Sequence, residues 1–370
     1  MVRRSRHLRA VAAVTLAFAV ECAFEAAAQA QALIERFEPA ERGSRFFVAD
    51  SLELDGNLRF TTGVVTSYGS ELRTFRQTSG AAPPALIAQS VWIHPGASLV
   101  LSPGARFSID VPVALQSGSA VASAGTLYPE PASPRLGDVR GSFDMRLLGR
   151  ERSDVNGAVV AAGVSAYVPT GSAEAYASDD FARFALRLAT SVKGGPIRVA
   201  ARVGYMYRRA DLAPIAGVQI GSEANGVLAA GYEYGPIVIG PEVYGSTILD
   251  DAFKKKSTPI EVLAGAHVRV GPFQLGVGIG TAVVPGLGAA RGRGVLSIEW
   301  TPVTEVARDR DNDGVMDADD VCPDVPGPSD APVGSRGCPQ GIPELPPPKA
   351  SPAVPEGAQD PEPEASPIQD

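Results

Sequence analysis

The sequence predicts an all-β protein whose main part is a closed antiparallel transmembrane barrel of about twelve strands. Three observations support this prediction. Apolar and polar residues alternate through most of residues 57–302, which is the period of a β-strand and not of a helix. Short turns and long loops follow one another in strict order between the alternating segments. No apolar stretch approaches the roughly 20 residues that a membrane helix needs, so a membrane-spanning form of this chain requires a closed barrel.

The first residues are typical of a secretory signal peptide. Four arginines within the first nine residues precede the apolar run "AVAAVTLAFAV", and "AQAQA" then offers small-residue cleavage sites after Ala30 or Ala32. The apolar run is too short to cross a bilayer as a helix. We therefore expect residues 1–32 to be removed on export, and residues 33–56 to form a periplasmic N-terminal segment before the barrel.

The alternation is clearest in "PIRVAARVGYMYRR", where Ile197, Val199 and Val203 share one face and Arg198 and Arg202 share the other. Segments of this kind are close to the roughly 9–11 residues of a tilted membrane strand. An even number of them is typical of a bacterial single-chain barrel. The predicted strands begin near Asn57, Ile87, Phe107, Val139, Val155, Phe181, Ile197, Asn225, Ile237, Ile260, Phe273 and Arg293.

The connections favour a membrane barrel over a soluble one. Outer-membrane barrels have short turns on the periplasmic side and long loops outside, and "SPGA", "KGG" and two Gly-Pro pairs alternate here with much longer segments. The last strand, "GVLSIEW", ends on Trp300, which resembles the terminal signal that the outer-membrane barrel-assembly machinery reads. A soluble β-sandwich also alternates and is the competing fold. The signal peptide, the loops and Trp300 favour the outer membrane, with lipid around the barrel and the C-terminal segment in the periplasm.

Charged residues of the predicted strands share the inward face. Two uses stay open for them: ion pairs that fill the interior, or a narrow aqueous path with a preference for anions. Arg183 and Arg187, beside Arg198 and Arg202 across the "KGG" turn, form the densest predicted positive strip. The candidate lumen residues are Arg140, Asp144, Arg146, Arg183, Arg187, Arg198, Arg202, Glu242 and Arg269, with Asp110, Glu233, His267 and Glu299 on the same faces.

An enzyme is the competing functional class, because some barrels of this size are lipases or proteases. Only His94 and His267 remain once the signal peptide is removed, and both are predicted to point inward. Neither lies in a nucleophile motif such as GxSxG. We therefore predict no enzymatic activity. The net charge of −8 and the scattered basic residues also argue against nucleic acid as a partner.

The segment "DRDNDGVMDADD" has the acidic spacing of an EF-hand loop, with Gly314 at the turn position. Calcium requires many hard oxygens around one point, and alternating carboxylates bring them there. No apolar helix flanks the loop, so a paired sensor hand is not predicted. The alternative is an acidic linker without metal. The candidate Ca²⁺ ligands are Asp309, Asp311, Asp313, the carbonyl of Val315, Asp317 and Asp320.

Two cysteines remain after signal removal, Cys322 and Cys338. An even pair in an oxidising compartment predicts one disulfide, and two free thiols are the alternative. The bridge would close a loop of roughly fifteen residues, worth about 3 kcal/mol in the chain-entropy model. The absence of a CxxC motif removes support for redox catalysis or a zinc ribbon.

The pattern "DxDxDGxxDxxDxCP" resembles the thrombospondin type-3 repeat, in which calcium and a disulfide organise a chain with little core. The match extends through Cys338, so we place a calcium-binding segment at residues 305–341. The layout of signal peptide, barrel, calcium repeat and proline-rich stretch is similar to that of the OmpA family, as are "ERFEPAERGSRFF", "HPGASLVL", "PTGS" and "GPEVYGST".

The OmpA resemblance implies a structural or weakly pore-forming envelope protein with a calcium-stiffened periplasmic extension. In that family a peptidoglycan-binding domain follows the linker. Here residues 342–370 are rich in proline and acidic residues, and we expect them to be disordered. The wall-anchoring role is therefore in doubt, and the expected partners of the tail are cell-wall or other envelope proteins.

Overall fold

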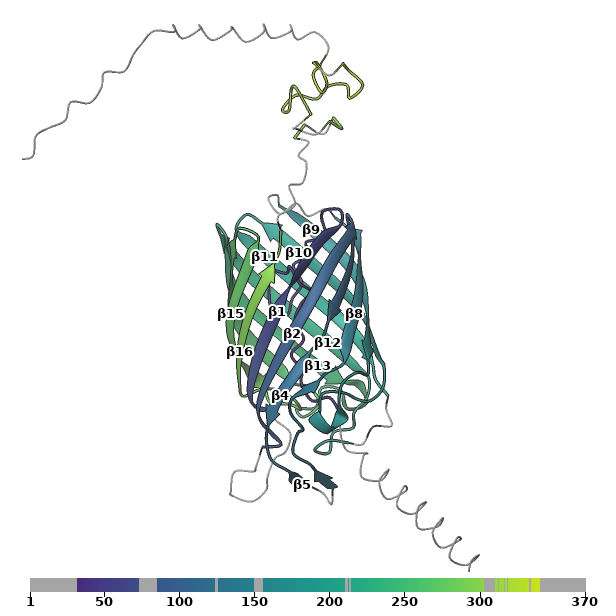
Figure 1. Cartoon of the computed structure of the whole chain (residues 1–370), viewed down its shortest axis with the longest axis vertical. Helices are drawn as coiled ribbons and strands as arrows, with labels where there is room; N and C mark the ends of the chain where they lie inside the picture. The colour runs from purple at the N-terminus through teal and green to yellow at the C-terminus, as the bar shows by residue number, and fades with distance from the viewer. Residues whose placement is uncertain are drawn as a thin grey trace, which may run out of the picture. The chain divides into compact units, whose positions relative to one another are not determined.

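The computed structural model describes residues 32–72, 85–123, 126–149, 156–209, 212 and 214–302, and residues 310–339 except 312, 316, 318 and 333 (Figure 1). The chain divides into one unit up to Thr304 and a second from Glu305. The predicted signal peptide up to residue 31 and the predicted proline-rich tail, residues 342–370, lie outside the described residues.

The first unit is built almost entirely of strands. No helix in the described part of the chain is long and apolar enough to cross a membrane. The elements are β1 (Arg59–Leu72), β2 (Ile87–Ser102), β3 (Ala105–Asp110), β4 (Val113–Ser117), β5 (Val121–Ser123), β6 (Thr126–Tyr128), β7 (Arg135–Leu136), β8 (Val139–Leu148), β9 (Gly157–Val168), η1 (Ala173–Ala175), β10 (Arg183–Gly194), β11 (Ile197–Tyr207), β12 (Glu223–Tyr234), β13 (Ile237–Ile248), η2 (Leu249–Asp251), β14 (Ile260–Val270), β15 (Phe273–Val284) and β16 (Gly292–Trp300).

These strands close into an antiparallel barrel. Each pairs with its neighbours in chain order, and β1 pairs with both β2 and β16, which seals the ring. β3 and β4 both pair with β2 and share one place in the ring, and the short β7 pairs with β4. Within the described residues the ring therefore has twelve places. The predicted all-β barrel is confirmed, and its predicted strands begin within two residues of the observed ones.

The connections differ at the two ends of the barrel. Tight turns join β2 to β3, β10 to β11, β12 to β13 and β14 to β15, and we call this the turn end. Gly195, Gly235 and Gly271 sit in three of these turns with φ of 57–58°, a left-handed conformation that glycine adopts without strain. The longer connections gather at the opposite, loop end.

The two faces of the wall have opposite polarity. Apolar side chains such as Leu186, Val203 and Ile279 point outward and are 60%, 62% and 71% exposed. Arg106 and Glu261 point inward and are buried. A continuous exposed apolar face around a closed barrel suits lipid and not water.

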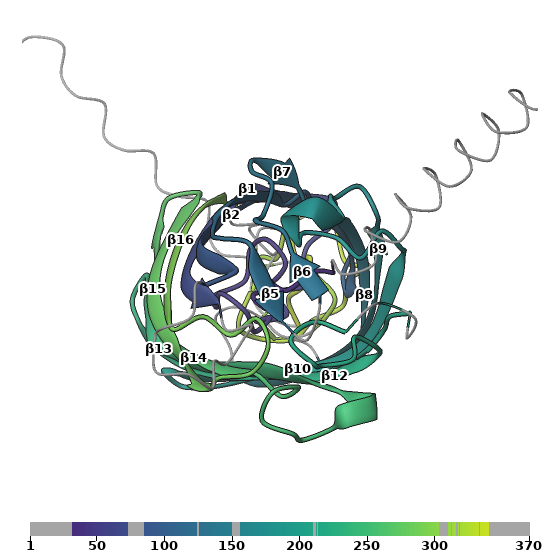
Figure 2. The same cartoon turned by 90° about the horizontal axis from the view of Figure 1, so that it is seen from below.

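Residues 32–55 lie inside the barrel, as Figure 2 shows for the purple start of the described chain. At the loop end, Ile34 packs in an apolar cluster with Tyr176 and Ile215. At the turn end, the Leu54 carbonyl accepts a hydrogen bond from the Gly104 amide (2.8 Å). The segment, called the plug below, therefore runs through the lumen from the loop end to the turn end, where β1 begins.

This placement corrects the prediction of a separate periplasmic segment over residues 33–56. The plug has no strand periodicity, so nothing in its pattern joined it to the barrel. Its charged side chains are buried instead because the inward faces of the wall supply their partners.

The lipid-facing assignment can be tested at Leu188, which lies near the middle of β10 and is 48% exposed. We expect Leu188→Arg to lower the free energy of unfolding by roughly 2–4 kcal/mol, the cost of a cation at the bilayer midplane. In water the same exposed position would tolerate arginine within about 0.5 kcal/mol. Heat-modifiable gel migration over a urea series in lipid vesicles measures the folded fraction. Leu127→Arg, on the β5–β6 hairpin outside the barrel sheet, is the control and should be neutral.

Candidate functional site

The loop-end half of the plug is held by ion pairs to the wall. Arg36 contacts both carboxylate oxygens of Glu223, at 2.7 and 2.9 Å. Glu35 accepts a bond of 2.8 Å from Arg293, which also contacts Glu261 at 2.6 Å. Glu35, Glu223, Glu261 and Arg293 are buried and Arg36 is nearly so, so each pair replaces water that both charges have lost.

The first described residues of the plug are anchored by a loop carboxylate. The Leu33 amide donates to Asp179, between β9 and β10, at 2.9 Å. Arg208 donates to the same carboxylate at 2.7 and 2.8 Å. Burial would raise the pKa of Asp179, but the charges of Arg208 and Arg183 outweigh burial and hold that pKa below its ordinary value. Asp179 therefore stays ionised and can accept all of these bonds.

The middle of the plug carries two adjacent charges of opposite sign, each paired with the wall. Glu41 contacts Arg187 at 3.1 Å and Arg140 at 3.4 Å. Arg42 contacts Asp110 at 2.6 Å. The plug thus neutralises a cationic and an anionic part of the wall with adjacent residues.

Glu242 holds the plug backbone. Its carboxylate accepts hydrogen bonds from the amides of Phe47, Val48 and Ala49 at 2.6, 2.8 and 2.9 Å. Glu299 accepts one more from the Gly43 amide at 2.7 Å. A carboxylate that takes three backbone donors satisfies groups that would otherwise be buried without partners.

The turn-end half is closed by further pairs and by apolar packing. Glu53 contacts Arg269 at 2.7 Å, and Asp55 contacts Arg146 at 2.9 Å. Asp50 pairs with Arg106, which also contacts Asp144 at 2.8 Å. Phe46, Phe47 and Val48 pack with wall residues such as Val238 and Leu263. Residues 43–52 of the plug are accordingly all buried.

The predicted positive strip does not form as one surface. Arg183 starts β10 at the loop end and pairs with Asp138, whereas Arg198 is the second residue of β11, at the turn end, and pairs with Glu233 at 2.8 Å. Arg187 lies between them and is paired with Glu41 and Asp144. The side chain of Arg202 makes no hydrogen bond or ion pair with other described residues. The structure places the candidate lumen residues Arg140, Asp144, Arg146, Arg183, Arg187, Arg198, Arg202, Glu242 and Arg269 on inward faces.

Small cavities remain beside the loop-end half of the plug. One of about 40 Å³ is lined by Glu38, Trp92, His94 and Arg140, and one of about 60 Å³ by Arg36 and Arg202 among others. Each is large enough for a few water molecules, since one water needs roughly 10–15 Å³ of such space. Several lining polar atoms, including Trp92 Nε1 and His94 Nε2, have no hydrogen-bond partner in the described structure, so water suits both cavities.

His94 and His267 both lie in the lumen and contact the plug. His94 Nδ1 is 2.9 Å from Asp110 and its ring lies near Phe37. His267 packs against Phe47, with ring centroids 4.2 Å apart. Neither is at the lipid-facing rim, where a lipase would meet its substrate.

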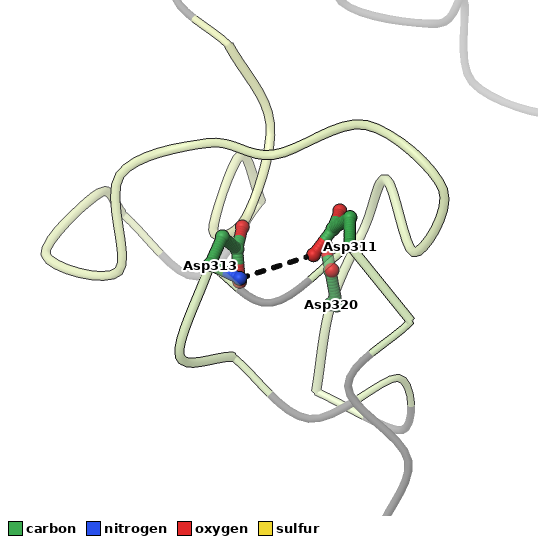
Figure 3. A group of neighbouring side chains, drawn as sticks. All are labelled: Asp311, Asp313 and Asp320. Carbon is green, nitrogen blue, oxygen red and sulfur yellow. Dashed lines mark hydrogen bonds between the residues drawn. The ribbon is translucent and has the colours of Figure 1, made fainter.

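The second unit brings three of the predicted Ca²⁺ ligands together. Carboxylate oxygens of Asp311, Asp313 and Asp320 lie within 4.8 Å of one another (Figure 3). Oxygens that share one calcium ion at 2.3–2.6 Å can be about 5 Å apart at most, so this spacing fits the ion. Asp320 is 91% buried, and its Oδ2 atom has no hydrogen-bond partner among the described residues. Gly314 makes the turn with φ of 90°.

Asp317, predicted at the ninth position, has another partner. Both its oxygens accept bonds from Arg310, one from the amide at 2.8 Å and one from Nε at 2.9 Å. This hydrogen bond, with the charges of Asp324 and Asp317, raises the pKa of the exposed Arg310 guanidinium. Val315 is buried, and its amide donates to Asp313. Asp309 lies outside the described residues.

The structure joins Cys322 to Cys338 by a disulfide, with Cα atoms 5.0 Å apart. The bridge lies close to the acidic cluster, because the Cys322 amide donates to Asp320 Oδ1 at 2.7 Å. Gly337, beside Cys338, also lies against Asp320: a Cβ there would be 2.0 Å from Oδ1. The disulfide therefore brings the far end of the segment onto Asp320.

No family model matches the sequence, and no curated relative matches it. The structure is similar to an outer membrane channel from Pseudomonas putida F1, at 11% identity over 66% of this chain and 96% of that chain, with a TM-score of 0.44. The NanC porin is 10% identical over 66% of this chain and 100% of that chain, with a TM-score of 0.43. The outer membrane phospholipase A from Escherichia coli is 10% identical over 67% of this chain and 99% of that chain, with a TM-score of 0.34. These values describe likeness of fold only. The closed ring, apolar outside and charged inside, is of the outer-membrane type.

Sequence reasoning missed the plug as part of the site. Its stretch "ERFEPAER" carries three acidic and two basic residues, and most are now seen paired with the wall. The available signal was the excess of arginine over carboxylate on the predicted inward faces. That excess requires additional acidic groups if the lumen is not filled with water.

The hydrogen bonds between Glu242 and the plug backbone, called the Glu242 clamp below, can be tested by thiol labelling. In a chain with Ala49→Cys, which is fully buried, we expect the thiol to resist a water-soluble maleimide. Glu242→Ala removes the acceptor of three amides, so the labelling rate should rise at least tenfold. Glu233→Ala is the matched control, because Glu233 pairs with Lys193 and Arg198 of the wall. Equal labelling of the two variants would contradict the clamp.

Proposed function

We propose that this chain is a non-enzymatic outer-membrane envelope protein of OmpA-like type, whose barrel is closed by its own plug. The signal peptide is removed on export. The loop end of the barrel faces the exterior, and the C-terminal segment extends into the periplasm. The barrel serves as a structural element, and any conduction is weak. Outer-membrane lipid surrounds it, the barrel-assembly machinery inserts it, and envelope or cell-wall components are the partners of the tail.

The plug carries this proposal. It spans the lumen, is buried along most of its length and neutralises the wall charges that would otherwise line a pore. The two cavities described beside it have room for a few waters each. Histidines held in the lumen against plug residues support the absence of hydrolytic activity; phospholipid hydrolysis that is lost in His94→Ala would contradict it.

Planar-bilayer conductance tests the closed lumen. We expect the wild-type barrel to give little or no stepwise conductance, and a variant with residues 34–51 replaced by a Gly/Ser linker of equal length to conduct. The open variant should prefer anions, because Arg140 and Arg187 lose Glu41. Adding Arg187→Ala should reduce that preference. Conductance of the wild type equal to that of the linker variant would refute the closed lumen.

We also propose that the second unit binds Ca²⁺ through Asp311, Asp313 and Asp320. Three carboxylates at this spacing repel one another without a cation, and the buried Asp320 retains an oxygen with no hydrogen-bond partner in the described segment. Asp309 and the Val315 carbonyl are the further predicted ligands. Asp317 joins them only if it leaves Arg310. The bound ion would stiffen the chain where it leaves the barrel.

Calorimetry on the full-length protein tests the calcium site. We expect binding with a Kd of about 10⁻⁴–10⁻³ M, as in extracellular calcium modules. Asp313→Asn combined with Asp320→Asn should abolish the heat of binding, because two of the three clustered carboxylates are lost. Asp330→Asn, an exposed acid of the same segment, should leave it unchanged. Unchanged heat in the double variant would reduce the segment to an acidic linker.

A further inference from the structure

The loop between β13 and β14 stands outside the ring of strands at the loop end (Figure 2). It carries η2, then Phe253, which is 86% exposed, then Lys254, Lys255 and Lys256, which are all exposed. A protruding aromatic side chain followed by cations is suited to the boundary between acyl chains and charged headgroups.

Beneath this loop the outer wall is hollowed by a groove of about 470 Å³, a volume within the usual range of ligand sites. Gly226 and Gly245 pair across β12 and β13, and their outward positions carry no side chain. A Cβ at Gly226 would meet only the Arg202 carbonyl oxygen, at 3.8 Å, so the hollow above it is open. Its apolar lining comprises Val203, Leu228, Val243, Phe253 and Ile260.

The groove lies in one half of the apolar band. β12 begins at Glu223, and the groove takes in residues 224–228 of this strand. Five residues at about 3.3 Å each, tilted by about 40°, descend roughly 13 Å, which is half of an apolar band about 25 Å tall. The groove therefore has the depth of a single leaflet, directly below the lysines.

The loop between β13 and β14 has more basic than acidic residues and so carries a net positive charge. It contains three lysines and two aspartates, Asp250 and Asp251. Asp251 is paired with Lys254. Lys256 donates only to the Ala216 carbonyl, at 3.4 Å. Lys255 makes no hydrogen bond or ion pair within the described chain. Lys255 and Lys256 thus have no anionic partner among the described residues, and both follow Phe253, which lines the groove.

We propose that this groove and the lysines above it bind a phosphorylated lipid of the outer leaflet. An acyl chain occupies the hollow over Gly226, and a headgroup phosphate contacts Lys255 and Lys256. The site rests on the proposed outer-membrane orientation, with the loop end outside, but not on the closed lumen.

Native mass spectrometry of the detergent-purified full chain tests this site, with diphosphorylated lipid A and with phosphatidylcholine as probes. We expect tighter binding of lipid A, weakened roughly 20-fold by Lys255→Gln with Lys256→Gln. Gly226→Leu should fill the groove and weaken both lipids. Two matched controls should bind as the wild type does. Arg135→Gln with Arg291→Gln removes exposed cations elsewhere, and Gly141→Leu adds a side chain where no atom lies within 4 Å.

Equal affinity for the two probes, or lipid A binding that survives both the lysine and the Gly226 variants, would overturn the site. Heat-modifiable migration shows whether each variant is folded. Biotinylation of lysines in intact cells reports the orientation separately, so a reversed barrel is distinguished from an intact barrel without a lipid site. A conducting wild type would count against the plug alone.

Discussion

The pairing of plug carboxylates with wall arginines is the interaction on which the rest of the structure depends. An apolar outer face leaves the interior as the only place for the charges of twelve strands. Buried charges are tolerated only when paired and hydrogen-bonded. Glu41 between Arg140 and Arg187, and Glu53 against Arg269, meet this requirement, and without them the same wall would need a water-filled lumen.

The two halves of the plug are held in the lumen by different interactions. Near the turn end, Phe46, Phe47 and Leu52 exclude water, and the Glu242 carboxylate binds consecutive amides between them. Near the loop end, ion pairs alternate with small cavities. The turn-end half therefore resembles a protein core, whereas the loop-end half is a set of ion pairs with small cavities beside it.

Strand positions could be predicted closely because the parity of a strand is local: each outward leucine or inward arginine is visible in its own segment. The same parity placed Arg140 and Glu242 in the lumen. The plug could not be found in this way, because its conformation has no period and is set by partners more than a hundred residues away, such as Glu223 for Arg36. The acidic loop shows the same limit. Ligand spacing marked Asp311, Asp313 and Asp320, but Arg310 takes Asp317 through a bend that spacing does not reveal.

The direction in which the plug is threaded has a consequence for assembly. The chain passes through the lumen before it forms β1, and β1 is also the strand that meets β16 at the seam. Residues 32–55 must therefore occupy the interior before the seam closes, or the chain end must later be drawn through a finished ring. A sequence fused ahead of Ala32 would emerge at the opposite end of the barrel from Trp300. The two ends of this domain thus lie at opposite ends of the barrel, although it has an even number of strands.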